Sequence, residues 1–271
     1  MTYKMIVLDL DDTLLCDDHS ISPRTKEALM RAQEQGVKVV LASGRPTFGM
    51  REYANELLLH QYGSYILSFN GGKIINCSSN EEMFSSTLSA ESVHQLFDIS
   101  RRENVFIHTY IGDEIITMDE NPFTKKESTL TGLPIKMVSN FVQSVTVPVV
   151  KSLMVAEPDV LKDVEKKLQK ELDEQFSIMR SKPYFLEFTE KGVTKGTSLH
   201  QLIQKCGIKQ EEVIAIGDSY NDISMIEFAG LGVAMGNAPQ EIKDLANFVT
   251  DTNMNDGVAK VVEDFILNVT V

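Results

Sequence analysis

Acidic and hydroxyl side chains follow three short apolar runs of this sequence. The polar segments are 9–13 (DLDDT) after the run 5–8, 43–45 (SGR) after the run 37–41, and 217–222 (GDSYND) after the run 213–216. If the apolar runs are neighbouring strands, several carboxylates converge on one small volume, where they repel one another unless a cation lies between them. The ligands would all be hard oxygens, which suits Mg²⁺ rather than Zn²⁺.

The apolar runs have the pattern of strands in a parallel sheet that is covered by helices. The run 5–8 is continuous, as is typical of a strand buried on both faces, and the mainly apolar runs 37–41 and 65–69 have the pattern of two further strands. A helix is expected between the first two, because Ser22 and Pro23 are typical of a helix start and Gly36 of a helix end. A second helix is expected over 47–59. This alternation predicts a parallel sheet, whose ligands bind beyond the carboxyl ends of the strands.

The middle of the chain has a different pattern, which predicts a separate α+β unit. Its expected elements are the helices 90–103 and 159–174 and the strands 105–110, 115–118, 151–156, 177–180 and 185–189. Prolines and glycines interrupt any regular pattern over 121–148. The α/β alternation then returns, with helices expected over 195–206, 223–228, 239–246 and 257–267 and a strand over 212–216. We therefore expect an α/β core made of residues 1–82 and 190–271, with an α+β domain inserted at 83–189.

Charge and composition narrow the class of protein. Hydrophobic residues make up 42% and charged residues 24%, the balance of an ordinary soluble globular protein. The net charge of −13 disfavours binding to nucleic acid or to an anionic membrane. The three cysteines lack a CxxC spacing, and neither a signal peptide nor an apolar stretch of about 18 residues is recognisable. We expect a cytoplasmic protein with reduced thiols, either a monomer or a homodimer.

The polar segments together resemble the signature motifs of the haloacid dehalogenase superfamily of phosphatases, in particular its Cof-type branch with a large α/β cap. The matching residues are Asp9, Asp11 and Thr13 for the first motif, Ser43 for the second, Lys195 for the third and Gly217 to Asp222 for the fourth. The resemblance spans the whole chain, and the motifs stand in the family's order. Asp12 departs from the pattern, since glycine is common at that position, and it adds negative charge beside the site.

The resemblance implies a Rossmann-like core with an inserted cap, and a magnesium-dependent phosphatase of small metabolites, expected to be sugar phosphates. Asp9 would attack phosphorus to form an aspartyl-phosphate, and Asp11 would donate a proton to the leaving oxygen and later accept one from water. The implied metal ligands are Asp9, Asp11 through its backbone carbonyl, Asp218, and Asp222, which would either hold a metal-bound water or orient Lys195. The implied phosphate-binding residues are Leu10, Ser43, Gly44, Lys195 and Asn221.

Several interpretations stay open at this stage. Each polar segment taken singly is also typical of a turn between a strand and a helix, and Lys195 without the family context would be an ordinary solvated charge. Glu187 is a candidate contact to a sugar hydroxyl or, equally, a surface strand residue. Arg45 receives no catalytic role. The alternatives to a phosphatase are a phosphosugar mutase and a non-catalytic phosphosugar-binding protein, and the Asp9/Asp11 pair disfavours the latter.

Overall fold

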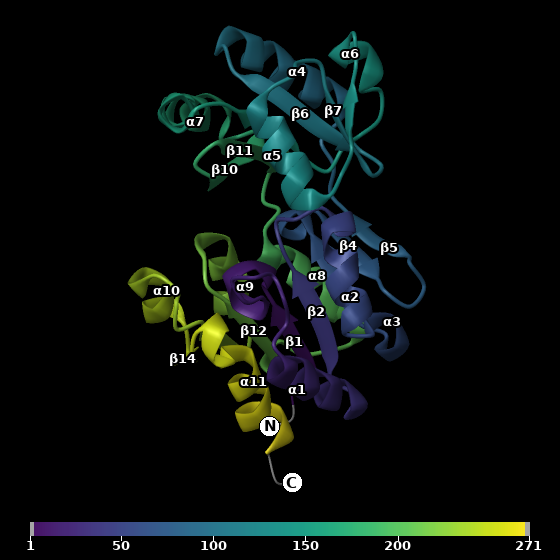
Figure 1. The fold of residues 1–271 in the computed structure, drawn as a ribbon, viewed down its shortest axis with the longest axis vertical. Coiled ribbons are helices and arrows are strands. Elements are labelled where there is room, and N and C mark those ends of the chain that lie inside the picture. Colours follow the sequence, from purple (N-terminus) through teal and green to yellow (C-terminus); the bar gives the residue numbers. More distant parts are fainter. Residues whose placement is uncertain (1–2, 269–271) are drawn as a thin grey trace. The chain divides into compact units, whose positions relative to one another are not determined.

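A computed structural model describes residues 3–268 of the chain (Figure 1). The chain forms two compact units. The core unit comprises Met1–Phe84 and Thr194–Val271, and the inserted unit comprises Ser85–Val193. These divisions lie two to four residues from the boundaries expected from the sequence.

An eight-stranded sheet with the order β14-β13-β12-β1-β2-β3-β4-β5 forms the centre of the core unit. Its strands are β1 (Met5–Leu8), β2 (Lys38–Ala42), β3 (Tyr65–Ser68), β4 (Lys73–Asn76), β5 (Glu82–Ser85), β12 (Val213–Gly217), β13 (Leu231–Ala234) and β14 (Phe248–Val249). All neighbouring pairs from β14 to β3 are parallel, and β4 runs antiparallel to β3. Leu8 at the end of β1 lies opposite both Leu41 of β2 and Ile216 of β12. The parallel-sheet core is confirmed, and the three strands that precede the polar segments are neighbours.

Helices cover both faces of this sheet. They are α1 (Pro23–Glu34), α2 (Arg51–Glu56), α3 (Leu59–Tyr62), α8 (Lys195–Cys206), α9 (Ile223–Phe228), α10 (Gln240–Leu245) and α11 (Gly257–Val262). Alternate residues of β1 enter two separate apolar clusters: Ile6 packs in the cluster that contains residues of α1 and α11, and Val7 packs in the one that contains residues of α8. Burial on both faces explains why β1 is a continuous apolar run.

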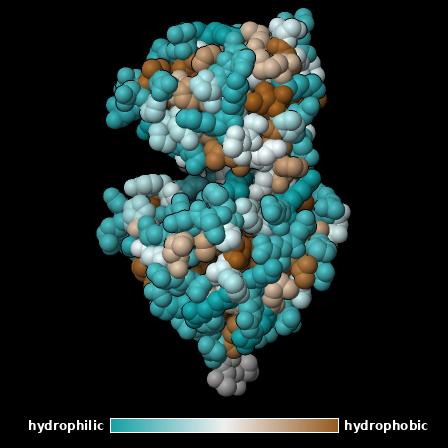
Figure 2. All heavy atoms as spheres, in the orientation of Figure 1, coloured by the Kyte–Doolittle hydropathy of each residue, from teal (hydrophilic) through white to brown (hydrophobic). Residues whose placement is uncertain are grey.

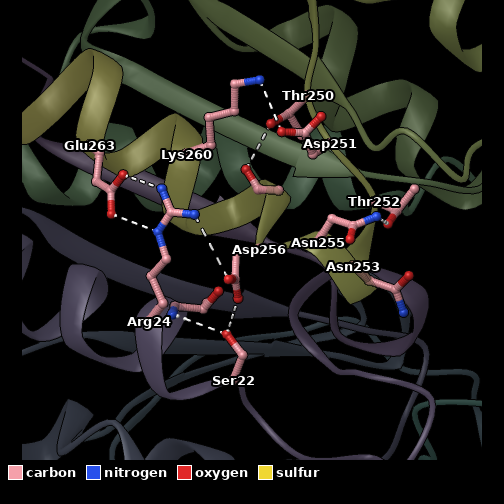
Figure 3. Close-up of polar contacts among 12 residues, drawn as sticks. Ser22, Arg24, Thr250, Asp251, Thr252, Asn253, Asn255, Asp256, Lys260 and Glu263 are labelled. Carbon is pink, nitrogen blue, oxygen red and sulfur yellow. Dashed lines mark hydrogen bonds and ion pairs between the residues drawn. The ribbon is translucent and has the colours of Figure 1, made fainter.

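A polar network joins the start of α1 to the segment 250–263 (Figure 3). Ser22, the N-cap of α1, donates a hydrogen bond from its hydroxyl to Asp256, and Arg24 contacts Glu263 through two nitrogens. In the same segment, Asn253 Nδ2 donates to the backbone carbonyl of Leu15, 3.0 Å away. Leu15 directly follows the irregular turn 10–14, so this network supports the turn that carries the first polar segment.

The inserted unit is built on a six-stranded sheet with the order β10-β11-β9-β6-β7-β8. Its strands are β6 (Phe106–Ile111), β7 (Glu114–Thr117), β8 (Ile135–Met137), β9 (Ser152–Val155), β10 (Phe176–Lys182) and β11 (Phe185–Glu190); its helices are α4 (Ala90–Arg102), α5 (Pro122–Thr131), α6 (Phe141–Ser144) and α7 (Pro158–Leu172). All neighbouring pairs are antiparallel except β7 and β8. An apolar cluster with residues of α4, α7 and the sheet forms its interior, as expected of an α+β unit.

Two expectations about local structure are wrong. The single helix expected over 47–59 is instead a 3₁₀ turn followed by two short helices, α2 and α3. Leu58 adopts a left-handed conformation with φ of 52°, which separates α2 from α3. The segment 121–148, in which no regular element was expected, contains α5, β8 and α6. Pro122 stands at the first turn of α5, where its missing N–H costs nothing, and Gly132 ends the helix with φ of 74°.

Hydrophilic residues cover most of the visible face of each unit, with hydrophobic residues in scattered patches (Figure 2). Within residues 3–268, no helix has the length and apolar character needed to cross a bilayer.

Candidate active site

The three polar segments meet at one edge of the core sheet, because they follow three adjacent parallel strands. Asp9 follows β1, and its backbone N–H donates to the carbonyl of Ile216 in β12, 3.0 Å away. Ser43 follows β2 and is 3% exposed. Asp218 follows β12. The sheet therefore brings together residues that are up to 209 positions apart in sequence.

Lys195 lies between two of the carboxylates. Its Nζ donates to Asp9 Oδ1 at 2.5 Å and to Asp222 Oδ1 at 2.6 Å. Lys195 is the first residue of α8, whose start is fixed by a capping box between Thr194 and Thr197. Burial by itself would lower the pKa of the Lys195 ammonium, but the charges and hydrogen bonds of Asp222 and Asp9 raise that pKa above its ordinary value. The two carboxylates therefore favour the charged form of Lys195, although its side chain is fully buried.

Three carboxylates form a group that could hold a metal ion. One oxygen from each of Asp9, Asp218 and Asp222 lies within 4.8 Å of the others, in a search of the described residues. Burial and the charge of Asp222 raise the pKa of Asp9 well above its usual range, against the opposing effect of Lys195. Burial and Asp222 likewise raise the pKa of Asp218 to about 7. A cation beside these groups would offset the repulsion, and an all-carboxylate donor set fits a hard divalent ion.

Hydrogen bonds hold the last polar segment in place. Asp222 Oδ2 accepts from the backbone N–H groups of Asp218 and Ser219, each at 3.0 Å, while its other oxygen contacts Lys195. Thr13 Oγ1 donates to Asp218 Oδ1 at 2.9 Å, which links the first segment to the last. Asp222 thus connects the buried ammonium to the backbone of the loop after β12.

The Asp11 side chain lies outside this carboxylate group. Its two oxygens accept hydrogen bonds from Arg45, Nε to Oδ2 at 2.9 Å and Nη2 to Oδ1 at 2.5 Å. The side chain of Asp11 is 45% exposed, compared with 8% for Asp9. Sequence reasoning missed this partner, since an arginine that follows a Ser-Gly turn carries no signal for its contact.

The expected phosphate-binding residues Ser43, Gly44 and Asn221 share a neighbour that the sequence did not reveal. Asn221 Nδ2 donates to Asn70 Oδ1 at 3.0 Å, and the backbone N–H of Asn70 donates to the carbonyl of Ser43 at 2.9 Å. A Cβ atom on Gly44 would lie 3.1 Å from Asn70 Nδ2. Asn70 is buried with φ of 55°, a conformation that asparagine tolerates better than most residues. Leu10, the remaining expected member, is buried in the turn after Asp9.

Glu187 lies on β11 of the inserted unit and is 5% exposed, so its interpretation as a surface residue is wrong. Lys151 Nζ donates to Glu187 Oε1 at 3.0 Å, and Lys151 is 2% exposed. Next to this pair, Tyr110 donates its hydroxyl to Glu127 Oε1 at 2.5 Å, and Lys151 lies over the Tyr110 ring at 5.6 Å. The inserted unit therefore contains a buried polar cluster on its sheet.

Comparisons with known proteins agree with this architecture. The pattern of the haloacid dehalogenase-like hydrolases matches residues 6–262. A haloacid dehalogenase-like hydrolase from Bacteroides thetaiotaomicron has a similar structure, with a TM-score of 0.91 and 46% identity over 97% of this chain and 99% of that one. The HAD subclass IIB sugar phosphatase BT4131 has a TM-score of 0.81 and 27% identity over 97% of this chain and 98% of its own.

Among relatives by sequence is the 5-amino-6-(5-phospho-D-ribitylamino)uracil phosphatase YcsE of Bacillus subtilis. It is 31% identical over 97% of this chain and 96% of its own length. The matches span both units, so the resemblance to the Cof-type phosphatases is confirmed over the whole chain. The chain belongs to the haloacid dehalogenase-like hydrolases.

Proposed function

We propose that this phosphatase hydrolyses phosphomonoesters of small metabolites, foremost sugar phosphates, with Mg²⁺ and through an aspartyl-phosphate on Asp9. The observation that carries the proposal is the buried group of Asp9, Lys195, Asp218 and Asp222 at the carboxyl ends of three adjacent strands. The Lys195 ammonium contacts two carboxylates of this group of three, which leaves negative charge for a divalent cation to neutralise.

The first step joins Asp9 to phosphorus. A carboxylate oxygen of Asp9 forms a bond to phosphorus, the bond from phosphorus to the ester oxygen breaks, and its electron pair stays on that oxygen, which takes a proton from Asp11. In the second step, water attacks the aspartyl-phosphate, Asp11 accepts the proton of that water, and inorganic phosphate leaves with Asp9 restored. The sequence of bonds is balanced and requires no other reactant.

Neighbouring residues stabilise the transferred group. Asp9, Asp218 and the Asp11 carbonyl, with Asp222 through a water, would hold Mg²⁺, which would supply positive charge to the phosphoryl oxygens when bound. Lys195 adds a fixed charge beside Asp9. Ser43, Asn221 and the backbone N–H groups of Leu10 and Gly44 donate hydrogen bonds to the same oxygens, a role that their placement in the loops after β1, β2 and β12 supports.

The relatives and the inserted unit support the proposed substrate class. BT4131 is a sugar phosphatase, and YcsE acts on a phosphorylated ribityl compound, so both substrates carry hydroxyl groups next to the phosphate ester. Glu187, paired with Lys151, offers a carboxylate that could accept hydrogen bonds from such hydroxyls. We propose a small phosphorylated polyol or sugar as the partner, a cytoplasmic location, and a monomer or homodimer.

The test is phosphate release from p-nitrophenyl phosphate and from a panel of sugar phosphates, with Mg²⁺ or with excess chelator. Release that depends on Mg²⁺ in the wild type and is abolished in D9N supports the proposal. The control is D163N, because Asp163 is an exposed carboxylate on α7. Transfer of phosphate between sugar positions without net release would indicate a mutase, and binding without either reaction would indicate a phosphosugar-binding protein. A D9N variant with wild-type turnover would exclude the covalent mechanism.

A further inference from the structure

We propose that Arg45 is a positioning residue, which holds the Asp11 carboxyl group in the orientation that proton transfer to the leaving oxygen requires. The inference rests on the proposed function, and it assigns a role to a residue that the sequence left without one. Its basis is a two-pronged contact: Arg45 Nε lies 2.9 Å from Asp11 Oδ2, and Arg45 Nη2 lies 2.5 Å from Asp11 Oδ1. Two parallel hydrogen bonds fix the plane of a carboxylate as well as its position. When one oxygen carries the proton that Asp11 donates, the other oxygen can still accept from Arg45, as Oδ2 does from Nε, so the acid form is held in place as well.

Asp11 needs such a partner because its own surroundings leave it free to rotate. Its side chain is 45% exposed and lies outside the carboxylate group of Asp9, Asp218 and Asp222. Its backbone is extended (φ −70°, ψ 128°) within the irregular turn 10–14. An exposed carboxylate samples several rotamers in water, whereas a proton donor must lie within hydrogen-bond reach of the leaving oxygen.

Arg45 is itself held in place, so it can act as a rigid support. Its Nη1 donates to the carbonyl of Gly49 at 3.3 Å, and its guanidinium lies 5.5 Å from the centre of the Tyr53 ring. Its backbone N–H donates to Ser43 Oγ at 3.1 Å, and its carbonyl accepts from the N–H of Phe69 at 3.0 Å. The side chain of Arg45 is only 18% exposed. Contacts on both backbone and side chain thus fix the guanidinium that contacts Asp11.

Neither stability nor a second cation accounts for the orientation of Asp11. A partly exposed ion pair contributes little to stability, so a purely structural role does not account for the paired contact with Arg45. His19 Nδ1 also lies near Asp11 Oδ1, but at 4.0 Å it is too far for a hydrogen bond and cannot set the orientation of the carboxyl group. Arg45 differs from His19 because its guanidinium contacts both oxygens of the Asp11 carboxylate, and not because of its charge alone.

The dependence of rate on the leaving group separates positioning of Asp11 from other roles. An ester such as 2,4-dinitrophenyl phosphate expels a stable anion, so its P–O bond breaks without help from a proton donor. A sugar phosphate expels an alkoxide and depends on that donor. The value of kcat/KM reports the steps up to formation of the aspartyl-phosphate. Loss of the Asp11 orientation should therefore lower kcat/KM for the sugar phosphate and leave it nearly unchanged for the activated ester.

The experiment compares R45M and R45K with the wild type, with D11N as the reference for loss of the proton donor. For R45M we expect a fall of about 30–100-fold in kcat/KM with the best sugar phosphate, and a change below about threefold with 2,4-dinitrophenyl phosphate. R45K should resemble R45M, because an ammonium cannot make the paired contact. R31K is the matched control, since Arg31 is exposed on α1, and it should match the wild type with both esters.

Equal losses with both esters in R45M would overturn the inference, because they would mean that Arg45 contacts the phosphoryl group or supports the whole site. A crystal structure of R45M provides a second measurement that needs no turnover. Positioning predicts that the Asp11 side chain leaves its wild-type place, and an unmoved Asp11 would overturn the inference. A wild type inactive with both esters would instead refute the proposed function, and the crystal structure would still decide whether Arg45 orients Asp11.

Discussion

Replacing Lys195 by methionine should destabilise the core unit strongly, because the change removes the only buried positive charge from a group of three carboxylates in the described structure. Methionine has nearly the length of lysine, so K195M tests the charge more than the packing. Asp9 and Asp222 each lose a charged hydrogen bond, of 2.5 and 2.6 Å. Both side chains are almost fully buried, at 8% and 0% exposed, so water cannot replace the ammonium.

The magnitude follows from the cost of leaving a buried charge unpaired, about 3–5 kcal/mol when one partner of a buried ion pair is removed. For a domain of this size, such a loss lowers the melting temperature by about 10 °C. The loss should depend on pH. Asp9 has a raised pKa even with Lys195 present, and removal of the ammonium raises that pKa further. A carboxyl group whose pKa is raised on folding stabilises the protein at low pH and loses that contribution as the pH rises through the folded-state pKa. The deficit of K195M should therefore be larger at pH 8 than at pH 5.5.

The assay is differential scanning calorimetry of metal-free wild type, K195M and K195M/D222N at both pH values. The double variant removes one of the two carboxylates that lose their partner, so it should recover part of the stability that K195M loses at pH 8. A K195M protein that melts within about 2 °C of the wild type at both pH values would refute the reasoning, because the Lys195 ammonium would then contribute no net stabilisation.

Three further predictions concern other parts of the molecule. The pKa of Asp218 is raised to about 7 by burial and by Asp222, so Mg²⁺ must displace a proton at lower pH; the rise in melting temperature on adding Mg²⁺ should increase from pH 6 to pH 8, which thermal scans with and without chelator would measure. K151M should destabilise the inserted unit by about 3–5 kcal/mol, because Glu187 loses its buried ammonium, and K151M/E187L should recover most of that loss in urea unfolding. G196A should cost about 3 kcal/mol or prevent folding, since an added Cβ would lie 2.2 Å from the Ser224 carbonyl, and circular dichroism during urea unfolding would show it.

Periodicity and local signals predicted those elements of the fold whose boundaries are encoded in nearby residues. The helix expected over 195–206 matches α8, and the one over 223–228 matches α9. The failures have physical causes. Leu58 takes a left-handed conformation that leucine rarely adopts, so nothing local indicated the break before α3. In the segment 121–148, Pro122 and Gly132 start and end α5, but the same two residue types are also typical of a loop.

The site could be predicted only as far as backbone topology determines it. Once strands β2, β1 and β12 are neighbours, the residues that follow them must meet, so the convergence of Asp9 and Asp218 follows from the apolar runs alone. The contacts of Arg45 with Asp11 and of Asn70 with Asn221 depend on side-chain directions in irregular turns. A single sequence contains no signal for such contacts.

Under the proposed function, the electrostatics of the core connect metal binding to catalysis. One ammonium and three carboxylates leave the site negative, and a phosphate ester brings further negative charge, so substrate and site repel each other without a cation. Protons compete with a cation to neutralise the carboxylates, since the pKa of Asp218 is raised to about 7 and that of Asp9 is also raised. A protonated Asp9 is a poor nucleophile, because its lone pairs are less available for attack on phosphorus. A divalent cation removes both obstacles at once: it lowers the pKa of the carboxyl groups that bind it, and it neutralises the incoming phosphate. In the proposed mechanism, the fold thus places the nucleophile Asp9 where burial alone would keep it protonated, so turnover would depend on occupation of the metal site.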